Sequence, residues 1–461
     1  MKNILYLKKS NTIKYTLKKL NGAFGKLGCV IGNDKLLLGV VTEGDLRRAI
    51  LNGISINNKL EKIINVKPTF VYKHELVSKK ISESNFNATN LNASIFYVPI
   101  VNKKRKVLDV LSIENLIDIL ENKASKKRKS LSKLPNVLIV GGAGYIGTIL
   151  TNLLLKKKFK VTILDKLLYD KNVLKKNFKR NRNFKFIKGD VCDLNVQINS
   201  IKNIDIVVFL AEIVGDPACN ARPEDALKTN FLSLSSLATL CSHLSISKFI
   251  YTSSCSVYGI NKNNDLLTEK SPLNPVSHYA RIKIMSEKAL LSNKTDTFQP
   301  TILRLGTVFG PSFRNRFDLV VNTLAKNAFF NKKIVVHGGN QWRPNIHVED
   351  IANGIIAVIN SSISKVGNKI FNLSNDNLNY KIIDIAKFAK KSFPKSKLHI
   401  QKSTFDPRNY RVTSKKFFNA TKFKPKKNIL NSYIDFKKIF LQKKIKNPNN
   451  KIFSNFETLT K

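Results

Sequence analysis

The sequence predicts an α/β protein, in which a small α+β unit precedes a doubly wound parallel sheet and a smaller domain follows it. Two observations predict this fold class. From residue 136 onward, short apolar runs alternate with helical stretches, as in a parallel sheet covered by helices on both faces. The first of these runs leads directly into a glycine-rich turn, Gly141-Gly-Ala-Gly-Tyr-Ile-Gly147, which a helix pattern follows.

This opening strand, turn and helix have the pattern of a dinucleotide site. Gly141, Gly144 and Gly147 would allow a tight turn, close approach of a phosphate and close packing of helix on strand. The helix expected over residues 145–155 would point its first amides at a pyrophosphate. The next strand ends in Asp165, which can accept hydrogen bonds from a ribose diol. A carboxylate there would repel the extra phosphate of NADP, so the pattern favours NAD.

Length and composition narrow the class of protein. At 461 residues the chain should hold two to four domains. No apolar run reaches the roughly 18 residues of a membrane span, and the first residues lack the apolar segment of a signal peptide. We therefore expect a cytoplasmic protein without membrane contact. The five cysteines show no metal-ligand spacing, so we expect reduced thiols and no metal.

The formal net charge of +49 raises the question of a nucleic-acid partner. The lysines, however, are scattered through every segment, and no aromatic-basic binding motif appears. We interpret the charge as a composition bias and expect no specific nucleic acid, although polyanions can bind at low salt.

The N-terminal residues form a separate unit. Short strands are expected at 29–31 and 36–41, and Thr42 is placed to cap the helix that follows. The stretch Gly39-Val-Val-Thr42-Glu-Gly-Asp45 resembles the signature of a CBS domain. A weaker copy over residues 96–115, about 70 residues later, suggests a CBS pair spanning residues 1–122.

The CBS resemblance implies that Thr42 and Asp45 contact the ribose and phosphate of an adenine nucleotide, with Ser112 and Asn115 as the second set. The second copy has Asp109 where the first has Gly39, and a carboxylate there would disfavour a phosphate. Alternatively, Thr42 and Asp45 only cap a helix and the pair serves dimerisation. The polar, basic residues 123–135 that follow are expected to be a linker.

A second chemical cluster follows the later strands. Ser254 ends the strand expected at 248–254, on the ligand side of such a sheet. Tyr279 and Lys283 are four residues apart and would share one helix face. A nearby ammonium favours the phenolate and so lowers the phenol pKa from about 10. The phenolate could take a proton from a sugar hydroxyl while NAD takes the hydride.

Together these motifs resemble the extended short-chain dehydrogenase/reductase family, in its nucleotide-sugar epimerase/dehydratase branch, over residues 136–440. The matching stretches are the glycine turn at 141–147, Gly189-Asp190-Val191-Cys-Asp193, Phe209-Leu-Ala-Glu212, Asn230, Ser253-Ser254, Val257-Tyr-Gly, Tyr279-x-x-x-Lys283 and Gly338-x-x-x-x-Arg343-x-x-Ile346-His-Val-x-Asp350. The resemblance implies a Rossmann-type domain over 136–305 that binds NAD.

The roles implied by the resemblance fall into three groups. The catalytic residues would be Ser254, Tyr279 and Lys283. The cofactor would contact Gly141, Gly144, Tyr145, Ile146, Gly147, Asp165, Asp190, Val191, Leu210, Ala211, Asn230 and Lys283. The nucleotide-sugar substrate would contact Arg343 and Arg408, with Arg314 and Arg316 as weaker candidates. An arginine suits a diphosphate because its planar fork binds phosphate oxygens in pairs.

The chain departs from the family pattern in one stretch. Glu212 stands where the family usually has a small residue, and Phe209 stands where it often has histidine. A carboxylate there could lie near the cofactor phosphates. A smaller substrate domain is expected over 306–440, and the Lys- and Asn-rich residues 441–461 look like a loose tail.

The function expected from these observations is that of an NAD-dependent nucleotide-sugar epimerase fused to a CBS pair, most simply a homodimer or higher homo-oligomer. In the dehydratase subgroup an Asp-Glu pair follows the serine or threonine before Val-Tyr-Gly, whereas here Cys255 and Ser256 follow Ser254. Two alternatives remain open: a 4-ketoreductase or dehydratase on the same scaffold, and a non-catalytic protein that senses NAD or adenine nucleotides or acts as a scaffold.

Overall fold

The computed structural model describes residues 4–20, 27–51, 53–74, 97–112, 134–261, 265–401 and 408–460. The chain divides into two compact units: residues 1–132 with the short stretch 192–198, and residues 133–191 with 199–461. Among the described helices, none combines the length and apolar character that crossing a lipid bilayer requires.

The first unit repeats one small pattern of strands. In each half a short parallel strand lies beside an antiparallel hairpin, giving the sheets β1-β2-β3 and β4-β5-β6. The strands are β1 (Leu5–Leu7), β2 (Leu27–Ile31), β3 (Leu37–Thr42), β4 (Val71–Tyr72), β5 (Tyr97–Val101) and β6 (Val107–Ser112), and the helices are α1 (Ile13–Leu20) and α2 (Glu43–Leu51). One apolar core joins residues of both halves, among them Cys29 and Val40 with Val101 and Val110. The internal repeat in the sequence therefore corresponds to a structural repeat.

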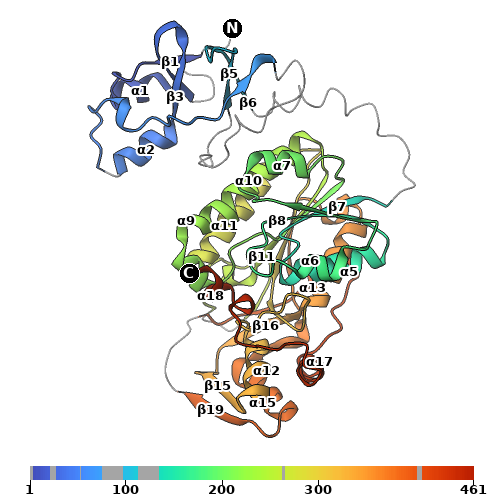
Figure 1. The fold of residues 1–461 in the computed structure, drawn as a ribbon. Helices are drawn as coiled ribbons and strands as arrows, with labels where there is room; N and C mark the ends of the chain where they lie inside the picture. The colour runs from blue at the N-terminus through green and yellow to red at the C-terminus, as the bar shows by residue number, and fades with distance from the viewer. Residues whose placement is uncertain are drawn as a thin grey trace. The chain divides into compact units, whose positions relative to one another are not determined.

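The second unit is built on a seven-stranded parallel sheet (Figure 1). The strand order is β17-β13-β11-β10-β7-β8-β9. The strands are β7 (Asn136–Val140), β8 (Lys160–Asp165), β9 (Phe184–Lys188), β10 (Ile206–Phe209), β11 (Lys248–Ser254), β13 (Thr301–Leu305) and β17 (Lys369–Leu373). The chain runs outward from β7 in one direction and from β10 in the other, so the order switches between these two central strands. Ligands bind at such a switch, outside the carboxyl ends of the strands.

Helices cover both faces of the sheet, as the alternating pattern predicts. On one side lie α5 (Tyr145–Lys156), α6 (Val173–Phe178) and α13 (Val348–Asn360); on the other lie α9 (Pro223–Leu227), α10 (Ser233–His243) and α11 (His278–Ser292) (Figure 1). Leu150 and Leu154 of α5 and Ile355 of α13 pack in one core with Val137 and Ile139 of β7. Further helices among the described residues are the short α7 (Leu194–Ser200), α8 (Asp216–Ala221), α14 (Ile363–Val366) and α16 (Lys415–Thr421), with a π-helical turn at Lys228–Leu232.

The smaller domain has its own phenylalanine-rich core. Phe317, Phe436 and Phe440 pack there with Ile385 and Ala386. Its elements are β14 (Thr307–Phe309), α12 (Val320–Phe330), β15 (Lys333–His337), β16 (Trp342–His347), β18 (Asn379–Lys381), α15 (Ile382–Ser392), β19 (Lys397–Gln401) and α17 (Ile429–Leu441). Between them the chain returns to the large sheet through α13 and β17. The domain boundary expected at residue 305 is thus crossed more than once.

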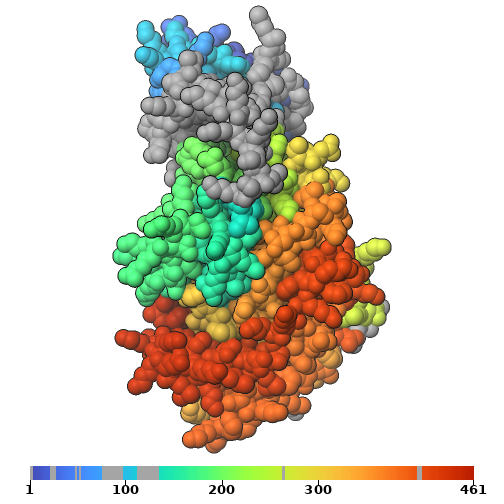
Figure 2. Space-filling view, turned by 90° about the vertical axis from the view of Figure 1, so that its right-hand side faces the viewer, coloured from blue at the N-terminus to red at the C-terminus, as the bar shows by residue number. Residues whose placement is uncertain are grey.

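The expectation of a loose tail after residue 440 is wrong. The structure has a 3-10 turn at Lys451–Phe453 and the helix α18 (Asn455–Leu459). Phe453 packs on Phe317, whose amide donates to the Phe453 carbonyl at 2.8 Å, and Leu459 is buried beside Tyr279. The red C-terminal residues lie on the surface of the orange smaller domain in Figure 2. The few apolar side chains that anchor this segment are not evident from its Lys- and Asn-rich composition.

Candidate active site

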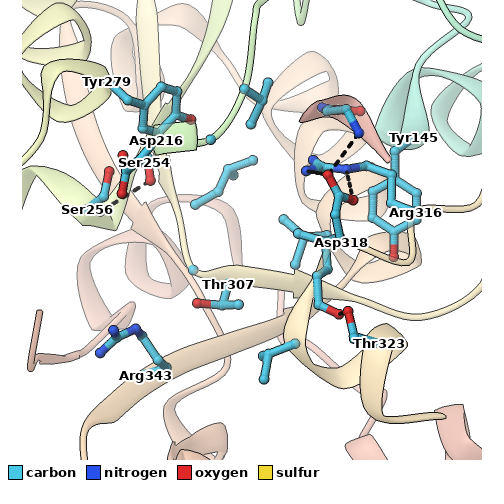
Figure 3. Close-up of a pocket in the computed structure, with 18 of the residues that line it drawn as sticks. Tyr145, Asp216, Ser254, Ser256, Tyr279, Thr307, Arg316, Asp318, Thr323 and Arg343 are labelled. Atoms are coloured by element: carbon cyan, nitrogen blue, oxygen red, sulfur yellow. Dashed lines mark hydrogen bonds and ion pairs between the residues drawn. The ribbon is translucent and has the colours of Figure 1, made fainter. Parts of the chain in front are cut away.

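A cavity of about 650 Å³ opens at the carboxyl ends of the central strands (Figure 3). It runs from the glycine turn after β7, past the start of α11, to Arg343 on β16 and Arg408. A second cavity of about 90 Å³ shares Gly141, Gly144 and Leu210 with it and extends toward the end of β8. The two cavities are therefore neighbours, which meet at the glycine turn.

The glycines of the turn let neighbouring segments of the backbone approach it closely. Gly141 has φ +82°, and a Cβ there would meet the Ala211 amide nitrogen at 2.5 Å. A Cβ on Gly147 would meet Gly142 Cα at 2.6 Å, so the third glycine lets the helix pack against the turn. Tyr145 and Ile146 open helix α5 and line the larger cavity, which places the positive end of the helix dipole at this cavity.

The smaller cavity is lined by residues that the sequence motifs assigned to the adenosine end of the cofactor. Asp165, at the end of β8, accepts hydrogen bonds from the amides of Ala143 (3.0 Å) and Leu167 (2.7 Å), and burial raises its pKa. Gly189, Asp190, Val191, Leu210 and Ala211 also line this cavity. The Asp190 carboxylate pairs with Lys166 Nζ at 3.0 Å. The structure thus gathers in one place residues that the sequence motifs assigned to the cofactor.

Arg314 is a buried cation that the sequence ranked only as a weak candidate. It is 2% exposed, its guanidinium lies 4.0 Å over the Tyr169 ring, and Nε and Nη2 have no hydrogen-bond partner among the described residues. Burial, together with the nearby Arg316, lowers its pKa to about 10. Arg316, by contrast, is paired with Asp318 at 2.9 Å. Since Arg314 lines the larger cavity beside Tyr145, it suits an anionic group such as a phosphate.

Ser254, Tyr279 and Lys283 all line the larger cavity. Ser254 ends β11, and its Oγ accepts the Ser256 amide at 3.1 Å. Tyr279 and Lys283 lie on α11, which begins where Ser277 Oγ accepts the Ala280 amide at 3.2 Å. The Lys283 ammonium lies 5.4 Å from the centre of the Tyr279 ring. The helix spacing read from the sequence therefore places both side chains at the strand end that carries the serine.

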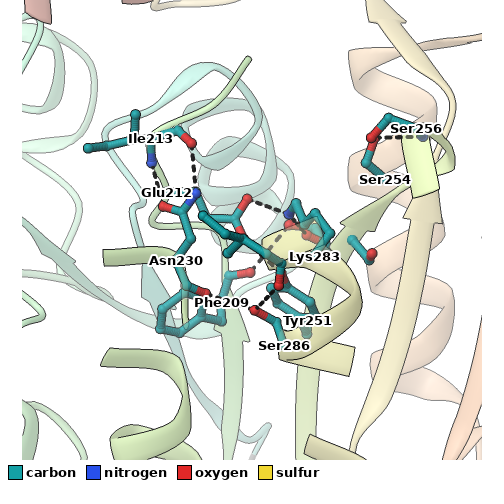
Figure 4. Close-up of polar contacts among 12 residues, drawn as sticks. Phe209, Glu212, Ile213, Asn230, Tyr251, Ser254, Ser256, Lys283 and Ser286 are labelled. Carbon is teal, nitrogen blue, oxygen red and sulfur yellow. Dashed lines mark hydrogen bonds and ion pairs between the residues drawn. The ribbon is translucent and has the colours of Figure 1, made fainter. Parts of the chain in front are cut away.

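Lys283 also has a partner that the sequence did not assign to it (Figure 4). Its ammonium forms an ion pair with Glu212 Oε2 and donates to the Thr252 carbonyl at 2.5 Å, while the Tyr251 hydroxyl donates to Glu212 Oε1 at 2.9 Å. The Lys283 and Glu212 side chains are 2% and 4% exposed. Burial and the Glu212 charge raise the pKa of Tyr279 well above its usual value. These two effects outweigh the lowering of the Tyr279 pKa that was expected from Lys283.

Asn230 does not line either cavity, contrary to its expected cofactor contact. Its side-chain oxygen accepts the Ile213 amide and its nitrogen donates to the Ile213 carbonyl, both at 2.8 Å. Both ends of the amide are therefore used to fix the loop after β10, the loop that carries Glu212.

At the far end of the cavity, two arginines come together. Arg343 donates to the carbonyls of Trp342 (2.8 Å) and Arg408, and Arg408 Nη1 pairs with Asp216 Oδ2 at 2.8 Å. Figure 3 shows Asp216 beside Tyr279 and Ser254, with Arg343 across the cavity. Asp216 was missed in the sequence, although a Gly-Asp-Pro step just after a buried strand is a usable signal.

In the N-terminal unit, the CBS signature residues bond to each other. Thr42 Oγ1 donates to Asp45 Oδ2 at 2.7 Å, and the Asp45 amide donates to Thr42 Oγ1 at 3.2 Å. This is a helix-capping arrangement at the start of α2. Neither residue lines the cavity of about 410 Å³ found in this unit, which is surrounded by Lys8, Lys9 and Lys59. Ser112 ends β6, and Asn115 lies outside the described residues.

Comparison with known proteins agrees with this geometry. A model described as the NAD dependent epimerase/dehydratase family matches residues 137–374, and a CBS domain model matches residues 1–52. The dTDP-D-glucose 4,6-dehydratase of Dictyostelium discoideum is 29% identical over 272 residues, which cover 55% of this chain and 61% of that protein. The UDP-glucose 4-epimerase of Lactobacillus helveticus is 28% identical over 275 residues, covering 55% and 81%.

A solved structure shows the same fold. The UDP-glucuronic acid 4-epimerase of Bacillus cereus, in complex with UDP-glucuronic acid and NAD, superposes with a TM-score of 0.60 at 24% identity, over 66% of this chain and 99% of that one. The Rossmann-type fold and the NAD cofactor expected from the sequence are thereby confirmed. The chain belongs to the NAD dependent epimerase/dehydratase family, carries a CBS domain at its N-terminal end and uses NAD as its cofactor.

Proposed function

We propose that this protein is a nucleotide-sugar epimerase, which oxidises one sugar carbon to a ketone and reduces it again from the opposite face. NAD supplies the hydride acceptor and donor for such a cycle. In this assignment Tyr279 accepts the proton of the sugar hydroxyl, and Ser254 hydrogen-bonds the same hydroxyl. Lys283 holds a positive charge beside Tyr279. The placement of these three side chains around one cavity supports the proposal.

The side chains after Ser254 favour epimerisation over loss of water, and this observation carries the proposal. Cys255 is buried, its thiol points to the Arg304 carbonyl at 3.3 Å, and burial raises its pKa far above the usual value. Ser256 lines the cavity, but its hydroxyl is neither acidic nor basic near neutral pH. Expelling water from the sugar needs an additional acid and base, which these two positions do not supply.

Asp216 is a carboxylate in the same cavity and lies near Tyr279 (Figure 3). One of its oxygens accepts a hydrogen bond from Arg408 Nη1 at 2.8 Å, so the carboxylate is held in an ion pair. We therefore assign Asp216 to the placement of Arg408 and not to proton transfer.

The arginines at the far end support a diphosphate substrate. Arg343 and Arg408 line the cavity on the side away from the glycine turn, and guanidinium groups bind phosphate oxygens in pairs. A nucleotide sugar placed with its diphosphate there would have its sugar near Tyr279. This orientation brings the sugar, and not the nucleotide, to the reacting groups.

The decisive experiment is mass spectrometry of products from a panel of nucleotide sugars incubated with the purified protein. An isomer of unchanged mass, formed without net consumption of NAD, is the expected result. A product lighter by one water would overturn the epimerase assignment in favour of a dehydratase, and stoichiometric reduction or oxidation of the cofactor would favour a ketoreductase. Bound cofactor without turnover of any sugar in the panel would favour the non-catalytic alternative.

A further inference from the structure

Glu212 is a buried carboxylate that the proposed reaction does not use. It follows β10 in the chain, and its two oxygens are occupied by Lys283 Nζ and by the Tyr251 hydroxyl. A carboxylate removed from water is costly unless it is paired and hydrogen-bonded, and both conditions are met here. Lys283 lies next to both Glu212 and Tyr279, so Glu212 can influence Tyr279 through the lysine.

The surroundings hold Glu212 firmly in this place. The next residue, Ile213, is fixed through both backbone polar groups by Asn230, whose side chain is fully buried. Lys283 is fixed from the other side by the Thr252 carbonyl, and its ammonium lies 4.8 Å from the centre of the Tyr251 ring. The contact between Glu212 and Lys283 is therefore built by residues of four segments: the loop after β10, the π-helical turn at Lys228–Leu232, β11 and α11.

The charges of Glu212 and Lys283 act on Tyr279 in opposite directions. The ammonium favours the phenolate, whereas the carboxylate disfavours it. Burial and Glu212, in that order, raise the pKa of Tyr279, and burial lowers the pKa of Lys283 while Glu212 offsets part of that effect. The other charged or titratable groups that act on these residues are Asp216 and Cys219 of α8, Tyr251 of β11, Glu287 of α11 and Arg316.

We propose that Glu212 is a positioning residue that acts through Lys283. Its carboxylate holds the lysine ammonium next to Tyr279 and cancels the ammonium's charge there. The enzyme therefore works at a higher pH than it would if Lys283 had no carboxylate partner. The inference rests on the proposed role of Tyr279 as the base. On this inference, the pH at which the enzyme works depends on the Glu212–Lys283 pair, which joins the loop after β10 to α11.

The pH dependence of kcat for sugar turnover tests this inference in Glu212→Gln. The substitution keeps the shape of the side chain and removes its charge, so the acid limb of the profile should move to lower pH by about one unit. Tyr251→Phe is the matched control, because it removes a hydrogen bond from the same carboxylate and leaves its charge; its acid limb should stay at the wild-type pH. An acid limb of Glu212→Gln that stays in place, or that moves to higher pH, overturns the inference.

A double variant keeps the test decisive if Glu212→Gln, which leaves a buried lysine unpaired, does not fold. Replacing both partners of a buried ion pair is tolerated far better than replacing one. In Glu212→Gln/Lys283→Met the two opposing charges are removed together, so the acid limb should remain near the wild-type pH despite a lower kcat. A shift of that limb by a unit or more would show that the two charges do not cancel.

A measurement without substrate separates this inference from the proposed function. In a Tyr251→Phe background, ultraviolet absorbance of the phenolate follows tyrosine ionisation, and the further change Tyr279→Phe identifies the contribution of Tyr279. Adding Glu212→Gln should lower the pH at which that contribution appears. If no nucleotide sugar is turned over but this shift occurs, only the proposed function fails; if the shift is absent, the role of Glu212 fails.

Discussion

The electrostatics at Tyr279 is decided by residues that lie far from it in the chain. Lys283 is four residues away on α11, but its ammonium is shared with Glu212 after β10 and with the Thr252 carbonyl of β11. The spacing of tyrosine and lysine alone predicts a lowered phenol pKa, and the structure shows the opposite direction, because burial and a carboxylate act together. In the proposed mechanism, three groups at the scale of single residues determine the chemistry: the Tyr279 phenol, the Lys283 ammonium and the Glu212 carboxylate.

Tyr279→Phe should lower kcat by about 10²- to 10⁴-fold, the range expected for loss of a general base. NAD affinity should change little, because in our assignment the phenol takes part in proton transfer and does not hold the cofactor. Turnover of the preferred nucleotide sugar and a fluorescence titration with NAD measure the two quantities. A variant with nearly full activity would remove Tyr279 from the mechanism.

Asp165→Asn should reduce the preference for NAD over NADP. The amide keeps an acceptor for the ribose but removes the charge that repels a 2′-phosphate, so NADP should bind about tenfold more tightly relative to NAD than in the wild type. Parallel titrations with both cofactors measure the ratio. Asp190→Asn serves as the control, since Asp190 lines the same cavity but its charge is already paired with Lys166. An equal change in both variants would contradict the specific role of Asp165.

At the scale of elements, helix α18 forms part of the active-site wall. Asn455 lines the larger cavity, its amide donates to Asp318 Oδ2 at 3.0 Å, and Leu459 is 3% exposed in a cluster with Tyr279 and Ile282. The helix is five residues long, too short to be stable without its tertiary contacts. Its docking therefore depends on a few apolar side chains.

Leu459→Ala should release this helix. Loss of a buried leucine side chain costs about 2 to 5 kcal/mol, more than such a short element can offset. We expect lower kcat/KM and faster proteolytic cleavage near the C-terminus, with an almost unchanged melting temperature of the main unit. Phe456→Ala is the matched control, because Phe456 belongs to the same helix and is 41% exposed. Equal behaviour of the two variants would argue against a role for α18 in the site.

At the scale of the whole molecule, the sheet and the smaller domain are interleaved by the chain. Residues 348–373 return to the large sheet as α13 and β17 before the smaller domain is completed by α15, β19 and α17. The larger cavity is accordingly lined by segments far apart in the sequence, among them Gly306, Arg343 and Arg408.

Removal of residues 1–122 tests the role of the N-terminal unit. If the unit is a nucleotide sensor or a dimerisation module, the full chain should respond to AMP or ATP in its activity or form a dimer, and the shortened chain should lose that property while keeping turnover. Coupling requires that the nucleotide bind two states of the protein with different affinity. Activity assays with added nucleotide and sedimentation of both proteins measure this. If both properties are unchanged, the unit is neither sensor nor dimeriser.

Local spacing in the sequence was enough to predict the parallel sheet, the glycine turn, Asp165 and the set of Ser254, Tyr279 and Lys283. The spacings concerned are the period of apolar runs, the backbone freedom of glycine and the four-residue repeat of a helix face. Local spacing could not predict the Glu212–Lys283 pair, the anchoring role of Asn230, the burial of Arg314 or the docking of helix α18. They join residues up to well over a hundred positions apart, and their energies come from burial and charge pairing, which depend on which segments the fold brings together.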